Sequence, residues 1–257
     1  MRLTRINEIE NYLMKKGAVG MPELLEHFGI SLNTLRRDID VLCRRGSVSK
    51  VYGGIVYNKE SNVEPFVQRS SLNVDEKMKI GKLASSFIED NDTIYIDSGT
   101  TTVNILQHIR PDMNITIICN SLNLFVEASK YPYLNLIAPG GIFYHKTHSF
   151  VGMASIAALQ DYHLSKSFMA ASGISLDMGA STNSFHEADI KKAVIARSEK
   201  VILMTDHSKI NRPAGIHIVS LTGLYAFVTD KKPPNEYMEL FNTHHVQCLY
   251  QHAEEEK

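Results

Sequence analysis

Cysteine is scarce in this sequence, and neither sign of charge is in excess. The three cysteines, Cys43, Cys119 and Cys248, lie far apart and form no CxxC pair. This argues against a disulfide framework and against a cysteine-based zinc site. The formal net charge of −1 over 257 residues argues against a protein held on nucleic acid by bulk positive charge.

Long apolar runs, repeats and low-complexity tracts are also missing. No stretch reaches the ~18–20 apolar residues that a membrane span needs, so no membrane partner is expected. No apolar segment follows the first five residues, so we expect no secretory signal. Together with the few cysteines, these absences predict a soluble protein of the reducing cytoplasm.

The apolar content is sufficient for folding, and the charge is unevenly distributed. The sequence is 44% hydrophobic, and its length allows one large domain or two smaller ones. Residues 1–57 hold nine basic and six acidic side chains, a net of +3. The rest holds 18 basic and 22 acidic side chains, a net of −4. This contrast predicts two parts with different tasks.

Apolar spacing in residues 1–57 predicts three short helices and a β-hairpin. We expect a first helix that ends at Gly17, a second that starts at Met21, and a third that follows Ser31 and stops at Gly46. Apolar β-type residues around the glycines at 53–54 predict the hairpin. The residues expected in this core are Ile6, Ile9, Leu13, Leu24, Leu25, Phe28, Leu35, Ile39 and Leu42.

The third helix has one apolar face and one polar, basic face. Arginine can read guanine bidentately and asparagine can read adenine in a DNA major groove, and a helix-turn-helix presents such a face to base edges. Hydroxyls near the helix N-terminus and a basic hairpin suit phosphate. The candidate DNA-binding residues are Ser31, Asn33, Thr34, Arg36, Arg37, Arg44, Lys50 and Tyr52. The alternative is the solvated face of an ordinary three-helix bundle.

From Lys77 onward, short β-type runs alternate with helical patterns. This alternation predicts an α/β domain with a largely parallel sheet over residues 77–250. Residues 58–76 are polar and read as a linker, and 251–257 as a charged tail. Strands are expected at 93–96, 115–118, 134–137, 201–204 and 226–228, and helices at 77–89, 101–109, 121–130, 152–160 and 186–198.

A polar loop that begins at Asp97 follows a predicted strand and precedes a predicted helix. Its glycine lets the backbone approach a ligand, and N–H and hydroxyl groups at a helix N-terminus attract an anion. An ordinary turn with an N-cap is the alternative. Because GxxxxGK[ST] and GxGxxG are absent, the loop is neither a Walker A nor a Rossmann motif. The candidate phosphate-binding residues are Asp97, Ser98, Gly99, Thr100 and Thr101.

Other polar loops follow other predicted strands, and in open α/β sheets such loops form the ligand site. Lys209 is a candidate for a phosphate contact, and Asp97 or Glu187 for sugar hydroxyls. The alternative for Lys209 is a surface lysine near a turn, and the alternative for Asp97 is a residue that caps its loop. We expect no cofactor and no metal, because histidines such as His145 and His148 do not form an HExxH motif or another strong ligand spacing.

Residues Ser31 to Ile39, with Leu42, Gly46 and Tyr52-Gly53-Gly54, resemble the DNA-binding signature of the DeoR-type repressors, bacterial winged-helix regulators of sugar catabolism. The resemblance covers about residues 3–57. It implies double-stranded operator DNA as the partner and a homo-oligomer, a dimer or a tetramer, on paired half-sites. Lys50 stands where the family usually has arginine, which keeps the charge but loses the bidentate fork.

Residues 77–250 resemble the DeoR-type effector domain, which is similar in fold to ribose-5-phosphate isomerases and binds phosphorylated sugars in that family. Residues 171–173 lack the acidic residue that members often carry there, and 181–187 fit only loosely, so the sugar is not specified. The positions carried over are Asp97, Ser98, Gly99, Thr100, Thr101, Asn120, Gly140, Gly141, Lys146, Glu187, Asp206 and Lys209.

The resemblance predicts a regulator, most simply a repressor of a carbohydrate-utilisation operon that a phosphorylated sugar releases from its operator, and not an enzyme. The alternative is a sugar-phosphate isomerase with an appended helical domain, with Asp97, Glu187 and Lys209 as reacting groups. The chain lacks the paired acidic and Lys-Gly loops that we associate with active isomerases, and it has no GxSxG elbow. An isomerase also has no use for a basic winged helix.

Overall fold

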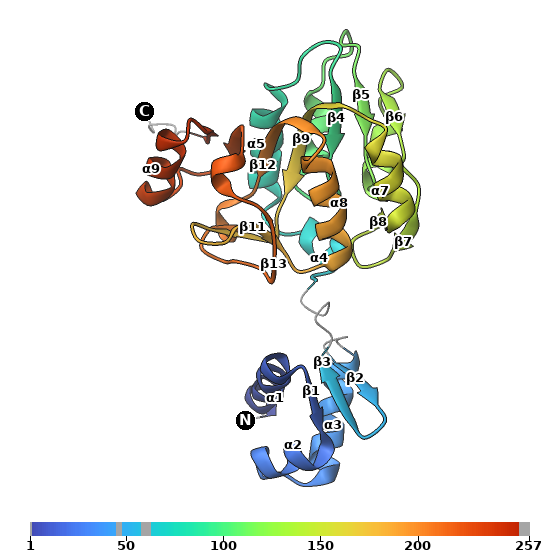
Figure 1. Cartoon of the computed structure of the whole chain (residues 1–257), viewed down its shortest axis with the longest axis vertical. Coiled ribbons are helices and arrows are strands. Elements are labelled where there is room, and N and C mark those ends of the chain that lie inside the picture. The colour runs from blue at the N-terminus through green and yellow to red at the C-terminus, as the bar shows by residue number, and fades with distance from the viewer. Residues whose placement is uncertain (1, 45–47, 58–62, 252–257) are drawn as a thin grey trace. The chain divides into compact units, whose positions relative to one another are not determined.

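The structure, a computed structural model, describes residues 2–44, 48–57 and 63–251. The chain divides into two units, Met1–Glu64 and Pro65–Lys257, and each is described by itself (Figure 1). The expected helix stop at Gly46 and residues 252–257 of the expected tail lie outside the described residues.

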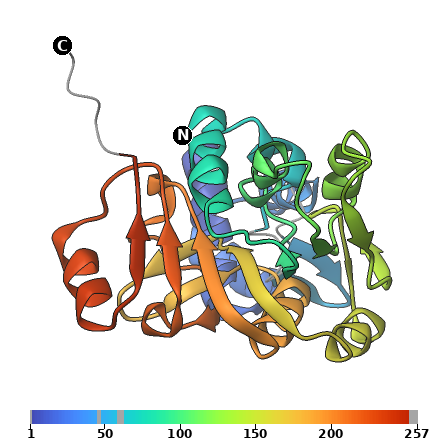
Figure 2. The same ribbon diagram turned by 90° about the horizontal axis from the view of Figure 1, so that it is seen from above.

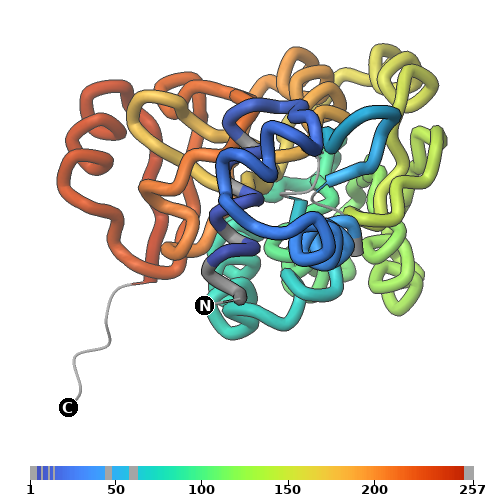
Figure 3. The backbone as a smooth tube through the Cα atoms, turned by 90° about the horizontal axis from the view of Figure 1, so that it is seen from below, coloured from blue at the N-terminus to red at the C-terminus, as the bar shows by residue number. Residues whose placement is uncertain are grey.

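The first unit is a three-helix bundle with a small antiparallel sheet, the blue tube of Figure 3. All the residues expected in its core are buried except Leu25 and Phe28, which are partly buried and pack against it. The three-residue strand β1 is too short to show alternation and was not anticipated. The elements are α1 (Arg2–Lys16), β1 (Ala18–Gly20), α2 (Met21–Phe28), α3 (Leu32–Arg44), β2 (Val48–Val51) and β3 (Gly54–Tyr57), with the strand order β1-β3-β2.

The second unit is built on a parallel sheet (Figure 2). This confirms the expected α/β class. In sheet order, the described strands are β15 (Gln247–Leu249), β14 (Ala226–Val228), β12 (Ser198–Met204), β9 (Leu164–Ala170), β4 (Thr93–Ile96), β5 (Thr116–Ile118) and β6 (Asn135–Ile137).

Helices cover both faces of this sheet. On one face, α5 (Val74–Ser85), the 3₁₀ helix η2 (Thr102–His108) and α6 (Leu122–Ala128) share a core with Ile94 and Ile96. On the other face, α7 (Met153–Gln160), α8 (Phe185–Ile195) and α9 (Asn235–Thr243) share a core with Tyr95. Alternate residues of β4 thus enter different cores, as period two requires.

In the described part of the second unit, two small antiparallel sheets accompany the parallel sheet. The hairpin of β7 (Ile142–Tyr144) and β8 (Ser149–Val151) holds residues 145–148 in its turn. A second small sheet joins β10 (Gly173–Ser175), β11 (Gly179–Thr182) and β13 (Ile216–Val219). The 3₁₀ helix η3 (His207–Lys209) follows β12, and the 3₁₀ helix η4 (Leu221–Gly223) follows β13.

The sheet contains one central strand that the sequence did not reveal. Strand β9 carries Lys166 and Ser167, which break an apolar run, yet both are buried. Lys166 donates to both carboxylate oxygens of Asp92, at 2.7 and 2.8 Å, and to Glu89 Oε2 at 2.6 Å. A buried charge is tolerated when it is paired in this way, so the polar residues of β9 are compatible with a central position in the sheet.

The expected linker 58–76 differs from the structure. Helix α4 (Phe66–Ser70) and the first turn of α5 lie inside it. The five residues of α4 are too few to show helical periodicity, and Phe66 is buried by packing that is distant in sequence. Among the described residues, no helix has the length and apolar character to cross a membrane.

Candidate functional site

Helix α3 buries one face and exposes the predicted DNA-contacting face. Asn33, Arg36 and Arg37 are exposed, and Thr34 is half-buried. Ser31 Oγ accepts a hydrogen bond from the Thr34 N–H at 3.3 Å, which caps the helix as expected. The side chain of Arg44 lies outside the description. The exposed groups can therefore meet base edges without unfolding the bundle.

The hairpin β2–β3 presents its tip to solvent. Tyr52 is fully exposed, and Val51 beside it is half exposed. Lys50 pairs with Asp40 of α3, with Nζ 2.6 Å from Oδ1, and this hydrogen bond raises the pKa of Lys50. Because both side chains are more than half exposed, the pair is weak and can open for a phosphate.

In the second unit, the strand order reverses between β4 and β9. From β4 the chain proceeds to β5 and β6 on one side, then crosses to β9, β12 and β14 on the other. Ligands of open α/β sheets bind outside the carboxyl ends of the strands at such a point. Asp97 follows β4 directly, and Ala170 ends β9. The fold therefore places the predicted loops at one edge.

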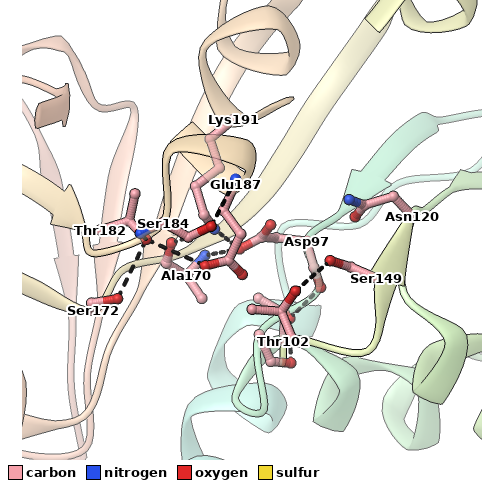
Figure 4. Close-up of polar contacts among 12 residues, drawn as sticks. Asp97, Thr102, Asn120, Ser149, Ala170, Ser172, Thr182, Ser184, Glu187 and Lys191 are labelled. Atoms are coloured by element: carbon pink, nitrogen blue, oxygen red, sulfur yellow. Dashed lines mark hydrogen bonds and ion pairs between the residues drawn. The ribbon is translucent and has the colours of Figure 1, made fainter. Parts of the chain in front are cut away.

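A buried ion pair closes the reversal point (Figure 4). Lys191 of α8 donates to Asp97 Oδ2 and to the Ala170 carbonyl, the latter at 2.9 Å. The same Asp97 oxygen accepts the Ala170 N–H at 3.0 Å. Asp97 thus has a fixed position and joins three elements.

The loop after Asp97 packs too closely for larger side chains. A Cβ added to Gly99 would lie 2.4 Å from Ala170 Cβ. Thr102 Oγ1 donates to the carbonyls of Asp97 and Gly99, at 2.7 and 3.0 Å. Ser98, Thr100 and Thr101 are buried with the rest of the loop. The loop is therefore rigid, as a preformed anion cradle needs to be.

Polar side chains from other elements line the same edge. Tyr95 donates to Asn120 Oδ1 at 2.7 Å, and burial together with Asp97 raises the pKa of Tyr95, which keeps this donor protonated. Asn120 in turn donates to the Phe150 carbonyl at 2.9 Å. Glu187, at the start of α8, accepts from Thr182 Oγ1 at 3.3 Å.

The remaining predicted positions lie in three further loops. Gly140 and Gly141 follow β6 and are exposed; Gly141 has φ 118°, which favours glycine. Lys146 is half-buried in the β7–β8 turn. Asp206, which follows β12, is buried and accepts from the Ser208 N–H at 3.0 Å. Lys209, three residues after Asp206, is half-buried.

The described residues contain no group of three or more His, Cys, Asp or Glu side chains arranged to hold a metal ion. The three cysteines are free, and burial raises the pKa of Cys248 to about 12, so its thiol stays protonated.

Comparison with known proteins accounts for both units. Residues 5–61 match the family described as the DeoR-like helix-turn-helix domain, and residues 72–231 match the DeoR C terminal sensor domain. The chain belongs to the DeoR family of transcriptional regulators. This DeoR-family chain is 39% identical to the HTH-type transcriptional regulator IolR of Bacillus subtilis, over 96% of this chain and 98% of the relative.

Two further comparisons show lower sequence identity. The chain is 29% identical to the glycerol-3-phosphate regulon repressor of Escherichia coli, over 95% of this chain and 96% of that protein. Among solved structures, ribose 5-phosphate isomerase A of Methanocaldococcus jannaschii is 16% identical with a TM-score of 0.41, covering 54% of this chain and 55% of that one.

Sequence reasoning missed one residue at the centre of this DeoR-family sensor. Lys191 was not among the candidates, although it follows Glu187 by four residues in a predicted helix. Side chains four apart share a helix face, so a basic residue at that position was a usable signal. Thr182 and Thr102 were also missed as partners, because hydroxyl side chains have no distinctive spacing.

Proposed function

We propose that this regulator represses a carbohydrate-utilisation operon and that a phosphorylated sugar releases it from the operator. The observation that supports this most directly is that one chain carries both an exposed Asn33, Arg36 and Arg37 face and a rigid polar loop at a strand-order reversal. The first suits DNA, and the second suits a small anion. Relatives that are named as repressors of a glycerol-3-phosphate regulon and of an aga operon agree with this.

On DNA, α3 occupies the major groove and the hairpin contacts the backbone. Arg36 and Arg37 contact bases or phosphates from the exposed face, while Lys50 contacts a phosphate after leaving Asp40. Residues 1–57 have a net charge of only +3, so a homo-oligomer with two recognition helices on two half-sites supplies the affinity.

In the sensor, the phosphate of the effector binds the loop of Ser98 to Thr101. Gly99 allows the ligand and the backbone to approach, and loop N–H groups and hydroxyls supply donors. Lys209, in the loop after β12, contributes an ammonium charge. Asn120 and Glu187 are placed to contact sugar hydroxyls.

The site binds its effector without converting it. An aldose–ketose isomerisation needs a positioned base that accepts a proton from carbon. Asp97 Oδ2 already accepts from Lys191 and from the Ala170 N–H. That oxygen therefore holds the site together, and we assign it no proton transfer.

Fluorescence anisotropy with DNA from upstream of the chain's own gene tests the proposal. We expect specific binding, a footprint with two-fold symmetry, and displacement by at least one member of a panel of sugar phosphates. The matched unphosphorylated sugars and inorganic phosphate serve as controls. Thermal shift on the same panel gives an independent measure, since a ligand at 100 times its Kd stabilises by about 2.7 kcal/mol.

Three results would count against this proposal. Failure to bind any upstream fragment at low salt would exclude the DNA partner. Displacement by unphosphorylated sugars alone would exclude the phosphate cradle. Conversion of a sugar phosphate by the purified protein at a rate lost in Asp97→Asn would support the isomerase alternative.

A further inference from the structure

Helix α4 lies where the chain enters the sensor unit, and loops of the proposed effector site hold it in place. We call residues 65–73 the α4 segment; it comprises the start of the unit at Pro65, α4, and the turn that leads into α5. The DNA-binding unit is covalently attached at the N-terminal end of this segment. Any displacement of the segment therefore moves that point of attachment.

The first contact joins the segment to the β7–β8 turn, residues 145–148. The Phe66 N–H donates to the Lys146 carbonyl at 2.9 Å. The Phe66 ring stacks on His148, with ring centroids 5.4 Å apart and planes 12° apart. His148 has φ 51°, in the left-handed region that few non-glycine residues adopt. A ligand that moved the β7–β8 turn on binding Lys146 would therefore move the partners of Phe66.

The second contact joins the other end of the segment to the loop after β12. Asn73 Nδ2 donates to Asp206 Oδ1 at 3.0 Å and to Ser208 Oγ at 3.3 Å, across more than 130 residues of sequence. Asp206 is buried and precedes Lys209 by three residues. Asn73 also has a left-handed backbone, with φ 51°. The Asn73 side chain makes no capping hydrogen bond to α5, and its amide bonds to Asp206 and Ser208 instead.

A buried lysine of α5 holds the α4 segment against that helix. Lys77 of α5 is 5% exposed, and its ammonium donates to the carbonyls of Arg69 and Leu72, the latter at 2.6 Å. The Arg69 carbonyl lies in the last turn of α4, where a positive charge is favourable, and Leu72 lies in the turn that follows it. The segment and α5 therefore form one body that responds to both loops.

A cavity of about 300 Å³ borders this body. Phe66, Ser70 and Lys77 line it on one side, and Thr100 of the phosphate-binding loop lines it with α6 residues on the other. Packed helices that move do so by repacking into available space. The cavity provides that space next to the loop that the effector would occupy.

We propose that the α4 segment couples effector binding to DNA release. This inference rests on the proposed function and specifies how that site is regulated. Effector bound between the loops that carry Lys146, Asp206 and Lys209 shifts one or both contacts, and the α4 segment adopts a second position. The effector then lowers the population of the DNA-competent position. The equilibrium constant between the two positions changes by no more than the ratio of the effector's affinities for them.

The decisive variant is Asn73→Gly. Glycine tolerates the left-handed backbone and the N-cap position, so the substitution removes the amide contacts with Asp206 and Ser208 and little else. Asn91→Gly is the matched control, because Asn91 also has a left-handed backbone, with φ 65°, but lies before β4, at the opposite edge of the sheet. His148→Gly tests the first contact in the same way.

The measured quantity is the ratio of DNA dissociation constants with and without the sugar phosphate that displaces the wild-type protein. In general such coupling ratios are about 5- to 150-fold. We expect the wild-type ratio in Asn91→Gly and a ratio that falls toward one in Asn73→Gly and His148→Gly. By reciprocity, calorimetry should show that DNA no longer weakens effector binding to these two variants.

The outcomes separate this inference from the proposal on which it rests. Wild-type ratios in both folded variants would overturn the role of the α4 segment and leave the proposed function intact. If no sugar phosphate displaces even the wild-type protein, the proposed function fails, and the inference fails with it. If Asn73→Gly does not fold, the His148→Gly ratio decides alone.

Discussion

Lys191 donates to the carboxylate of Asp97 across 94 residues of sequence, and the two side chains are only 5% and 2% exposed. Asp97 directly follows β4, Lys191 belongs to α8, and both also bond to the backbone of Ala170 at the end of β9. The pair therefore joins three elements where the strand order reverses. Removing one charge would leave the other buried without its ionic partner, which costs more than removing both.

We expect Lys191→Met to lower the free energy of unfolding of the sensor unit by about 3–5 kcal/mol. Urea denaturation followed through the sensor transition measures the loss. The double variant Asp97→Asn with Lys191→Met should recover most of it, because no buried charge is then unpaired. Equal losses in the single and double variants would contradict this account of the pair.

Lys209→Ala should leave DNA affinity unchanged and abolish displacement by the sugar phosphate. The reason is the loss of an ammonium charge that we assign to the phosphate. Lys79→Ala, on the exposed face of α5, is the control and should respond as the wild type does. Displacement of Lys209→Ala at the wild-type effector concentration would remove this residue from the site.

Arg37→Ala should weaken operator binding by about 1–3 kcal/mol if the side chain reads a guanine, and relax specificity at one base pair. Competition with a set of single-base operator variants measures both effects. Lys15→Ala, exposed at the end of α1, provides the control for lost charge. Unchanged affinity in Arg37→Ala would reject the base contact.

The Lys50–Asp40 pair predicts opposite effects of two substitutions on DNA binding. Lys50→Ala should weaken binding to all sequences alike and reduce the salt slope by roughly one unit. Asp40→Asn should strengthen binding without changing specificity, because it frees Lys50 and removes a negative charge from α3. Anisotropy titrations over a salt series measure both, and a sequence-selective loss in Lys50→Ala would contradict a phosphate contact.

Asp92 predicts an acid-sensitive contribution to stability. Burial raises its pKa, but hydrogen bonds from Lys166, the Glu89 N–H and Ser165 outweigh burial and lower it overall. Because the pKa of Asp92 is lower in the folded state, its ionised carboxylate stabilises the folded protein at pH values above the unfolded pKa of about 3.9. This stabilisation is lost as the pH falls through the folded pKa. The stability difference between wild type and Asp92→Asn should therefore shrink from pH 6 toward about pH 2. A difference that is constant with pH would contradict the lowered pKa.

Elements that carry their own pattern were predictable. Strands 93–96 and 226–228 have the expected bounds, and Ile6, Ile9 and Leu13 are buried as their spacing indicates. Strand β9 was not predictable, because the burial of Lys166 depends on Asp92 and Glu89 in other segments. Helix 101–109 was expected as an ordinary helix and is the 3₁₀ helix η2.

The resemblance to the DeoR family, the polar face of the third helix and the loop of Asp97 to Thr101 could be recognised in the sequence, because each depends on residues that are neighbours along the chain. The contact of Lys191 with Asp97, and those of Phe66 and Asn73 with the loops of Lys146 and Asp206, could be found in the folded chain alone. These contacts join residues about 80 to 130 positions apart. Local periodicity carries no information about such pairs, since strand order and helix packing bring them together.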